Sequence, residues 1–278
     1  MALRDSTTTS PPARLPEIKS SATESTSAVL VIDSLVKRFG KVEAVTDLSL
    51  IVPAQSIFGI VGPNGAGKTT TLSMVTGLLR PDAGRVTINN FDVWRHPAAA
   101  KRQLGILPDR LRIFDRLTGA QFLYYAGVLR GLDRATAKSR LVDLSQAFGL
   151  EDALGRLVTD YSAGMMKKVA LAAAMIHSPR MLVLDEPFEA VDPVSTATII
   201  GILQRYVAAG GTVVLSSHSM ELVQQICDSV AIMVSGRVIA SGTVDEVRGT
   251  LTLEERFVQL VGGRRSAEEM EWLHTFSD

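Results

Sequence analysis

Short apolar runs alternate with amphipathic stretches along most of this chain. The apolar runs predict β-strands at residues 29–32, 48–51, 56–61, 85–88, 181–184 and 212–215. Apolar residues at helical spacing, with capping residues and glycines at the ends, predict helices at residues 68–76, 118–129, 141–148, 162–177 and 193–209. Strands and helices alternate before and after the two successive helices at residues 118–129 and 141–148. We therefore expect an α/β fold on a parallel sheet, with these two helices inserted between its strands as a helical lobe.

The two ends of the chain differ from this alternating middle. Residues 1–27 are rich in Ser, Thr and Pro, lack the continuous apolar segment of a signal peptide, and are predicted to be a disordered tail. Near the other end, Leu253, Phe257 and Leu260 predict a short amphipathic helix. We therefore expect a main domain over residues 28–243, with its helical subdomain at about 112–160, and a C-terminal helical extension over 244–278.

Composition narrows the classes of function. The 278 residues are 46% hydrophobic and carry 29 basic and 29 acidic side chains, so no excess positive charge favours nucleic acid as a partner. Cys227 is the single cysteine, which excludes an intramolecular disulfide and suits a reducing compartment. The longest apolar run, residues 169–176, is much shorter than the roughly 18 residues typical of a membrane-spanning helix.

A phosphate-binding loop is the most specific motif. Residues 62–70 fill every position of the pattern G-x-x-x-x-G-K-[ST] between a predicted strand and a predicted helix, so an anion would sit at a helix N-terminus. Its residues are Gly62, Pro63, Asn64, Gly65, Ala66, Gly67, Lys68, Thr69 and Thr70. In this pattern the backbone amides cradle phosphate oxygens, the lysine reaches the β- and γ-phosphates, and the hydroxyl of Thr69 can bind Mg²⁺.

Two carboxylates follow the predicted strand at residues 181–184. In an open α/β sheet, ligands bind at the carboxyl ends of the strands, which places Asp185 and Glu186 beside the phosphate loop. Asp185 would then support the Mg²⁺ held by Thr69, and Glu186 could polarise the water that attacks the γ-phosphate. Taken alone, Asp185 and Glu186 fit an acidic turn after a buried strand as well as a metal and catalytic site. The phosphate loop earlier in the sequence favours the metal and catalytic site.

A second candidate anion site lies just before that strand. Ser162, Ala163 and Gly164 open a predicted helix, with Ser162 as its cap and Gly164 allowing close approach of a ligand to the backbone. Capped helix starts are common, so this feature alone predicts little about function.

Together, these motifs resemble the ATPase subunit of ATP-binding cassette (ABC) transporters. The resemblance rests on their order along the chain and covers about residues 29–242. The motifs are the phosphate loop, the helical lobe, Tyr161-Ser162-Ala163-Gly164-Met165, Leu184-Asp185-Glu186-Pro187, Val191-Asp192-Pro193 and Ser216-Ser217-His218. The resemblance implies a nucleotide-binding α/β fold with a mainly parallel core sheet, an antiparallel β subdomain and an inserted helical subdomain. Within the family, the Tyr-Ser-x-Gly-Met variant is similar to subunits of drug, antibiotic or polymer exporters.

The resemblance implies a role for each matching position. Lys68, Glu186 and His218 would be catalytic, with His218 contacting the γ-phosphate, and Phe39 would stack on adenine, although an aromatic beside a strand is more often part of the core. Ser162, Ala163 and Gly164 would complete the ATP site of a second subunit, either another copy or a paralogue. Two subunits would then close head to tail around two ATP molecules, with Asp192 coupling the two sites. Among the other histidines, His177 lies at a helix end, where cations are favoured.

Three positions depart from the family pattern. Asp109 stands where most members have a glutamine; a carboxylate can ligate Mg²⁺ but cannot donate a hydrogen bond to the attacking water. Ala163 replaces the usual first glycine of its pair but keeps its amide, and Met165 replaces a glutamine. Water positioning by residue 109 is therefore in question, whereas γ-phosphate binding by the helix start is expected to persist.

The expected activity is ATP hydrolysis that powers a separate membrane permease for export of a drug, antibiotic, lipid or polymer, at the cytoplasmic face of the membrane. Residues 111–117 and the aromatics Phe122, Tyr124 and Tyr125 would face the permease, although these aromatics could equally pack the core of the lobe. The alternatives are a soluble ATPase of the same superfamily acting on DNA or ribosomes, and an importer subunit. No nucleic-acid partner is expected, because the chain is not basic and lacks the long coiled-coil insertion and the second cassette of those soluble types.

Overall fold

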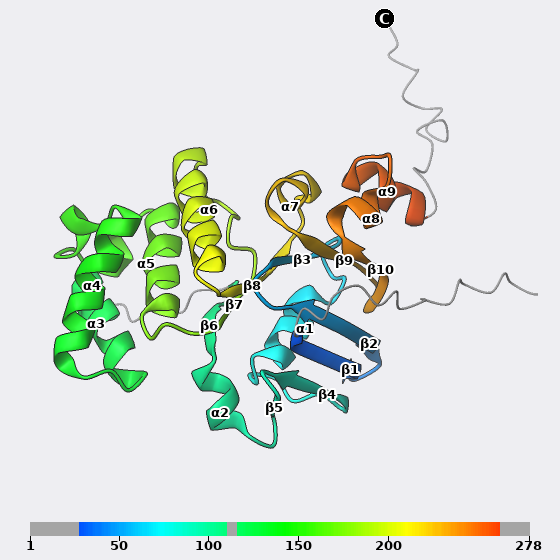
Figure 1. The fold of residues 1–278 in the computed structure, drawn as a ribbon, viewed down its shortest axis with the longest axis horizontal. Coiled ribbons are helices and arrows are strands. Elements are labelled where there is room, and N and C mark those ends of the chain that lie inside the picture. The colour runs from blue at the N-terminus through cyan, green and yellow to red at the C-terminus, as the bar shows by residue number, and fades with distance from the viewer. Residues whose placement is uncertain (1–27, 110–115, 262–278) are drawn as a thin grey trace, which may run out of the picture.

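The computed structural model of the chain describes residues 28–109 and 116–261 (Figure 1). The predictions for the N-terminal tail, for residues 111–115 and for the end of the chain beyond residue 261 lie outside these residues. No helix within the two described segments is both long enough and apolar enough to cross a bilayer.

The central element is a mixed sheet of six strands within these segments, in the order β10-β9-β3-β8-β7-β6. Its strands are β3 (Ile57–Val61), β6 (Leu104–Leu107), β7 (Met181–Leu184), β8 (Thr212–Ser217), β9 (Ser229–Val234) and β10 (Arg237–Thr243). The pairs β9-β3, β3-β8, β8-β7 and β7-β6 are parallel, and only β10 pairs antiparallel to its neighbour. The prediction of an α/β fold on a mainly parallel sheet is confirmed.

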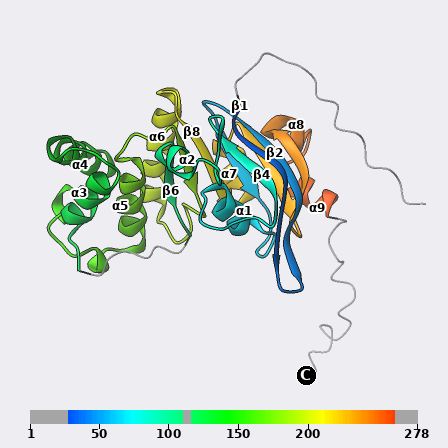
Figure 2. The same ribbon diagram turned by 90° about the horizontal axis from the view of Figure 1, so that it is seen from below.

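A second, antiparallel sheet lies beside the first at the end of the molecule away from α3 and α4 (Figure 2). It has the order β2-β1-β4-β5 and contains β1 (Ala28–Phe39), β2 (Val42–Pro53), β4 (Ala83–Ile88) and β5 (Phe91–Asp92). The sequence predicted only short parts of β1 and β2. Shifts of register along this pair interrupt the regular alternation that would have shown their full length.

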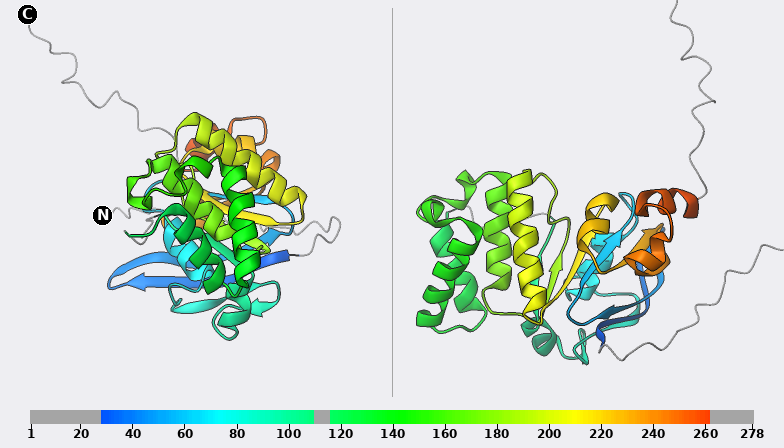
Figure 3. Two further views of the ribbon diagram at one scale, coloured as in Figure 1. Left: turned by 90° about the vertical axis from the view of Figure 1, so that its left-hand side faces the viewer. Right: turned by 45° about the horizontal axis from the view of Figure 1, so that its top comes forward.

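Helices connect the parallel strands, and α3 to α6 stand side by side at one end (Figure 3). They are α1 (Lys68–Val75), α2 (Pro97–Arg102), α3 (Gly119–Leu129), α4 (Arg134–Phe148), α5 (Ala163–Met175), α6 (Pro193–Ala208), α7 (Met220–Ile226), α8 (Val244–Arg248) and α9 (Leu253–Leu260). Thr118 caps α3 in a capping box, and Gly149 ends α4 in the left-handed conformation. These boundaries were predictable because each depends on a local cap.

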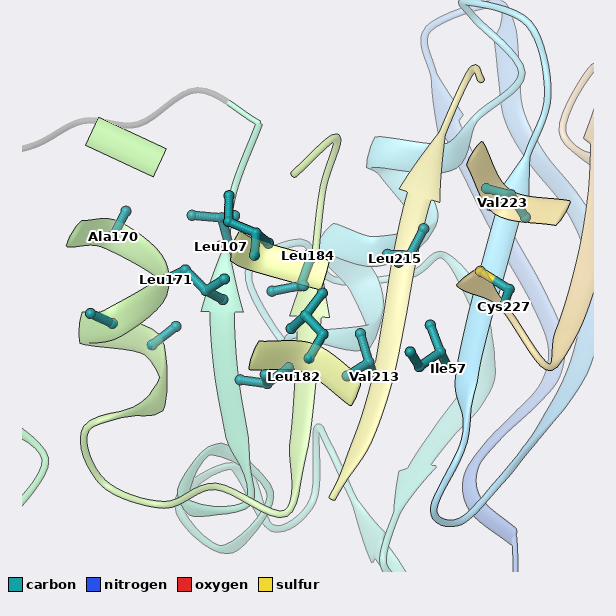
Figure 4. Close-up of a cluster of buried hydrophobic side chains, with 14 of the residues drawn as sticks. Ile57, Leu107, Ala170, Leu171, Leu182, Leu184, Val213, Leu215, Val223 and Cys227 are labelled. Atoms are coloured by element: carbon teal, nitrogen blue, oxygen red, sulfur yellow. The ribbon is translucent and has the colours of Figure 1, made fainter. Parts of the chain in front are cut away.

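Alternating side chains of the parallel strands pack into two hydrophobic cores. On one face, Leu182, Leu184 and Leu215 meet Leu171 of α5 and neighbouring helices (Figure 4). On the other face, side chains such as Val183 pack with α1 and the antiparallel sheet. The sheet is therefore covered on both sides, as expected for strands that are apolar along their whole length.

Candidate nucleotide site

The phosphate loop connects β3 to α1, as predicted. Gly65 and Gly67 have φ angles of +81° and +99°, which L side chains rarely adopt. A Cβ atom on Gly67 would lie 2.4 Å from the carbonyl oxygen of Ala44, whereas a Cβ on Gly65 would meet no atom within 4 Å. Gly67 is thus required by backbone conformation and by space, and Gly65 by conformation alone.

A cavity of about 500 Å³ opens over this loop. It is lined by residues 64–70 of the loop together with Ala44, Asp109, Glu186, Glu189 and His218. The catalytic and metal-binding residues predicted from separate motifs, except for the buried Asp185, therefore share one cavity. Ala44 and Glu189 were not predicted, because neither belongs to a recognisable motif.

Lys68 is held in place by the loop in which it lies. Its side chain is only 6% exposed, and its Nζ donates hydrogen bonds to the carbonyl oxygens of Gly62 at 2.8 Å and Pro63 at 3.3 Å. The same Nζ lies 3.6 Å from Oε1 of Glu186. A buried ammonium with these partners is pre-positioned to attract the phosphate oxygens of a nucleotide.

Glu186 projects into the cavity from the turn after β7. Its Oε2 lies 3.0 Å from Nδ1 of His218, which follows β8, so the two predicted catalytic residues are in direct contact. The backbone of Glu186 has φ +46°, a left-handed conformation that costs a residue of this type roughly 1–3 kcal/mol. The surrounding contacts that hold this conformation include the backbone N–H of Glu186, which donates to Oγ of Ser216 at 2.9 Å.

Asp185 lies deeper than Glu186 and is only 5% exposed. Burial raises its pKa, while hydrogen bonds from the hydroxyls of Ser216 and Thr69 act in the opposite direction. Ser216 was part of a recognised motif but had no predicted role; it bridges the two carboxylate residues by donating to Asp185 and accepting from Glu186.

The donor set around Thr69 fits a magnesium ion. Thr69 and Asp109 line the cavity, and the hydroxyl of Thr69 hydrogen-bonds Asp185, so the available donors are hard oxygen atoms. Within residues 28–109 and 116–261, no three His, Cys, Asp or Glu residues are grouped as a metal site.

The predicted helix start at Ser162 is present, outside the cavity. The hydroxyl of Ser162 accepts a hydrogen bond from the N–H of Met165 at 3.3 Å and caps α5. Ser162 and Ala163 are exposed, whereas Gly164 is buried against the start of α6. A Cβ on Gly164 would lie 3.0 Å from Oδ2 of Asp192, the residue that caps α6.

Phe39 is not among the residues that line the cavity. It ends β1 with 51% of its surface exposed, so it is not the core aromatic that one alternative suggested. Of the lobe aromatics, Phe122 packs partly buried against the main core, and Tyr125 is 47% exposed. The core alternative therefore does not hold for Tyr125, and the contact of these aromatics with a permease stays a prediction.

The expectation that the position of His177 at a helix end favours its cationic form is wrong. Burial, reinforced by the nearby guanidinium of Arg130, lowers the pKa of His177 to about 4. The contact of Nε2 of His177 with the carbonyl oxygen of Leu104 at 3.0 Å acts in the opposite direction, but burial dominates and the side chain is neutral at physiological pH.

Comparison with known proteins gives this site its context. The family model described as ABC transporter matches residues 45–189, which include the phosphate loop, the start of α5 and both carboxylates. The chain belongs to the ABC transporter family. This ABC chain is 41% identical over 207 residues to the ABC transporter ATP-binding protein NatA of Bacillus subtilis (strain 168), a match that covers 74% of the chain and 84% of the relative.

Two further matches agree. The ABC chain is 39% identical to the daunorubicin/doxorubicin resistance ATP-binding protein DrrA of Streptomyces peucetius, over 78% of the chain and 66% of that protein. A solved ATP-binding subunit of an ABC transporter superposes with a TM-score of 0.79 at 29% identity, covering 84% of the chain and 99% of that structure. The protein is thus an ABC-type ATPase subunit related to drug-resistance ATP-binding proteins.

Proposed function

We propose that this ABC ATPase binds and hydrolyses ATP to drive a separate membrane permease that exports a drug, antibiotic, lipid or polymer. The observation that carries the proposal is the position of Glu186, whose carboxylate lies between Lys68 and His218 over the phosphate loop. The names of relatives such as the daunorubicin/doxorubicin resistance protein support export rather than import as the direction.

In the proposed mechanism, Glu186 accepts the proton of the water that attacks the γ-phosphate. Lys68 and the amides of the phosphate loop, residues 62–70, bind the β- and γ-phosphates, and His218 holds Glu186 and contacts the γ-phosphate. Thr69, Asp185 and Asp109 would hold Mg²⁺, which would supply positive charge against the phosphate oxygens. Phe39 stacks on the adenine ring.

We further propose that two subunits close head to tail around two nucleotides. Ser162, Ala163 and Gly164 then face the ATP of a second copy or a paralogue, and Asp192 couples the two sites. The exposure of Ser162 and Ala163 and their position outside the cavity support this, since a helix N-terminus that does not serve its own cavity is free to bind phosphate elsewhere. Loss of the γ-phosphate removes contacts from both subunits and opens the dimer.

The domain organisation remains part of the same proposal. Residues 28–243 form the ATPase domain, with the helical subdomain at about 112–160, and residues 244–278 form an extension. The chain acts at the cytoplasmic face of the membrane as a peripheral subunit.

Two experiments test the proposal. For catalysis, Glu186→Gln should bind ATP with parental affinity and lose hydrolysis by about 100-fold or more; a parental rate would refute the role of Glu186. For the partner, the tagged chain should be captured from detergent-solubilised membranes of its own cell with one polytopic membrane protein in stoichiometric amount. Capture of ribosomes or DNA with no membrane protein would instead favour a soluble ATPase of the same superfamily.

A further inference from the structure

Lys167 is a buried cation on α5 that lies outside the cavity lining. Its side chain is 8% exposed, and its Nζ donates a hydrogen bond of 2.8 Å to the backbone carbonyl oxygen of Glu186. Within the part of the chain that the structure describes, no carboxylate oxygen lies close enough to this Nζ, within 4.0 Å, to form an ion pair. Burying an ammonium is costly unless it is hydrogen-bonded, so the contact with Glu186 needs an explanation beyond simple packing.

Side-chain hydrogen bonds hold the peptide groups on both sides of Glu186. On the amino side, the N–H of Glu186 donates to Oγ of Ser216 at 2.9 Å. On the carboxyl side, its carbonyl oxygen accepts from Lys167, and also from the N–H of Glu189 at the longer distance of 3.3 Å. Between these hydrogen bonds the residue keeps its left-handed φ of +46°, and this conformation directs the carboxylate to His218 and Lys68.

We propose that Lys167 is a positioning residue for Glu186: its ammonium holds the strained Glu186 peptide in the conformation that aims the carboxylate into the nucleotide cavity. The inference rests on the proposed role of Glu186 in hydrolysis. Lys167 acts through the backbone and exchanges no proton. Burial lowers the pKa of Lys167, and the carboxylates of Asp109, Glu189 and Asp185 act in the opposite direction by favouring its charged form.

Lys167→Met tests the proposal, because it keeps an unbranched chain of similar length and removes the donor. Lys168→Met is the matched control: Lys168 is the next residue on α5, partly exposed, and has no hydrogen bond to Glu186. We expect Lys167→Met to lower kcat for ATP by about 10- to 100-fold, the cost of a misplaced catalytic group, with KM for ATP unchanged within about twofold. Lys168→Met should keep parental kcat, and Lys167→Arg, which restores a cationic donor, should recover part of the rate.

A measurement without turnover separates positioning from catalysis. In the nucleotide-free protein, amide hydrogen exchange over residues 186–191 should be faster in Lys167→Met than in the parent, and unchanged in Lys168→Met. If Lys167→Met does not fold, Lys167→Leu, which also lacks a donor, is measured in the same way. A variant that folds with parental kcat and parental exchange in this turn would overturn the proposal.

The two variants distinguish the role of Glu186 from the role of Lys167. If Glu186→Gln keeps the parental rate, the proposed role of Glu186 is wrong, whatever Lys167 does. If Glu186→Gln loses the rate but Lys167→Met keeps it, only the positioning role of Lys167 is wrong.

Discussion

Alanine at Gly67 should destabilise the protein more than alanine at Gly65, although both glycines lie in the phosphate loop with positive φ. At Gly65 the new methyl group meets no atom within 4 Å, so the left-handed backbone is the only penalty. At Gly67 the methyl carbon would lie 2.4 Å from the carbonyl oxygen of Ala44 and 2.8 Å from Cε of Met233. The Met233 side chain can move aside, whereas the Ala44 oxygen belongs to the backbone of β2 and cannot.

The difference can be sized from these contacts. A left-handed non-glycine residue costs about 1–2 kcal/mol, which applies to both variants. Overpacking against a fixed backbone atom adds about 1–3 kcal/mol at Gly67 alone. With about 2–4 °C of melting temperature per kcal/mol for a chain of this size, Gly65→Ala should lose about 2–8 °C and Gly67→Ala about 4–20 °C.

Scanning calorimetry of the nucleotide-free variants, recorded at one pH and one scan rate, measures this difference directly. Both variants gain the same small stabilisation from a stiffer unfolded chain, so that contribution cancels in the comparison. The reasoning about the Ala44 carbonyl would be refuted if Gly67→Ala melted at the same temperature as Gly65→Ala, or above it.

Three further outcomes follow from burial. Because burial raises the pKa of Asp185, its ionised form destabilises the folded state at neutral pH, and this penalty fades as the pH falls through the raised pKa. Asp185→Asn should therefore raise the melting temperature of the nucleotide-free protein at pH 7, by a gain that shrinks in acid. A difference in melting temperature that does not depend on pH would contradict this. Burial also raises the pKa of the Cys227 thiol, so a maleimide should label the native chain hardly at all and the urea-unfolded chain at one thiol; rapid native labelling would show that the site is open. Phe148→Ala, at a fully buried position of α4, should lower the free energy of unfolding by about 3–5 kcal/mol in a urea titration, and a loss under about 1 kcal/mol would mean that α4 is not packed as described.

The sequence predicted those parts of the fold that depend on local chemistry. The turn of the phosphate loop, the cap at Ser162 and the helix end at Gly149 each follow from one or a few neighbouring residues, and the structure has all three. β5, β6, β9 and β10 were not predicted: β5 has only two residues and the four-residue run of β6 contains a glycine, whereas the apolar stretch of β9 does carry a strand signal.

The candidate site shows the same division. Spacing and order brought Lys68, Glu186 and His218 together, and the structure places them in contact or close to it. The contacts of Lys167 and Ser216 with the Glu186 backbone were not predictable, because they join residues 19 and 30 positions apart through a peptide group that carries no sequence signal. Long-range hydrogen bonds to the backbone are visible only once the chain is folded.

For the case in which the second subunit is another copy, the central claim is that ATP joins two copies of the chain until Glu186 helps to hydrolyse it. Sedimentation velocity of Glu186→Gln, with ATP and Mg²⁺ and then with ADP and Mg²⁺, tests it most directly, with Lys68→Ala as a control for nucleotide binding. The account predicts a species of twice the chain mass with ATP and a single chain with ADP, and no ATP-dependent change for the Lys68 variant. A Glu186→Gln protein that binds ATP and still sediments as a single chain would contradict it.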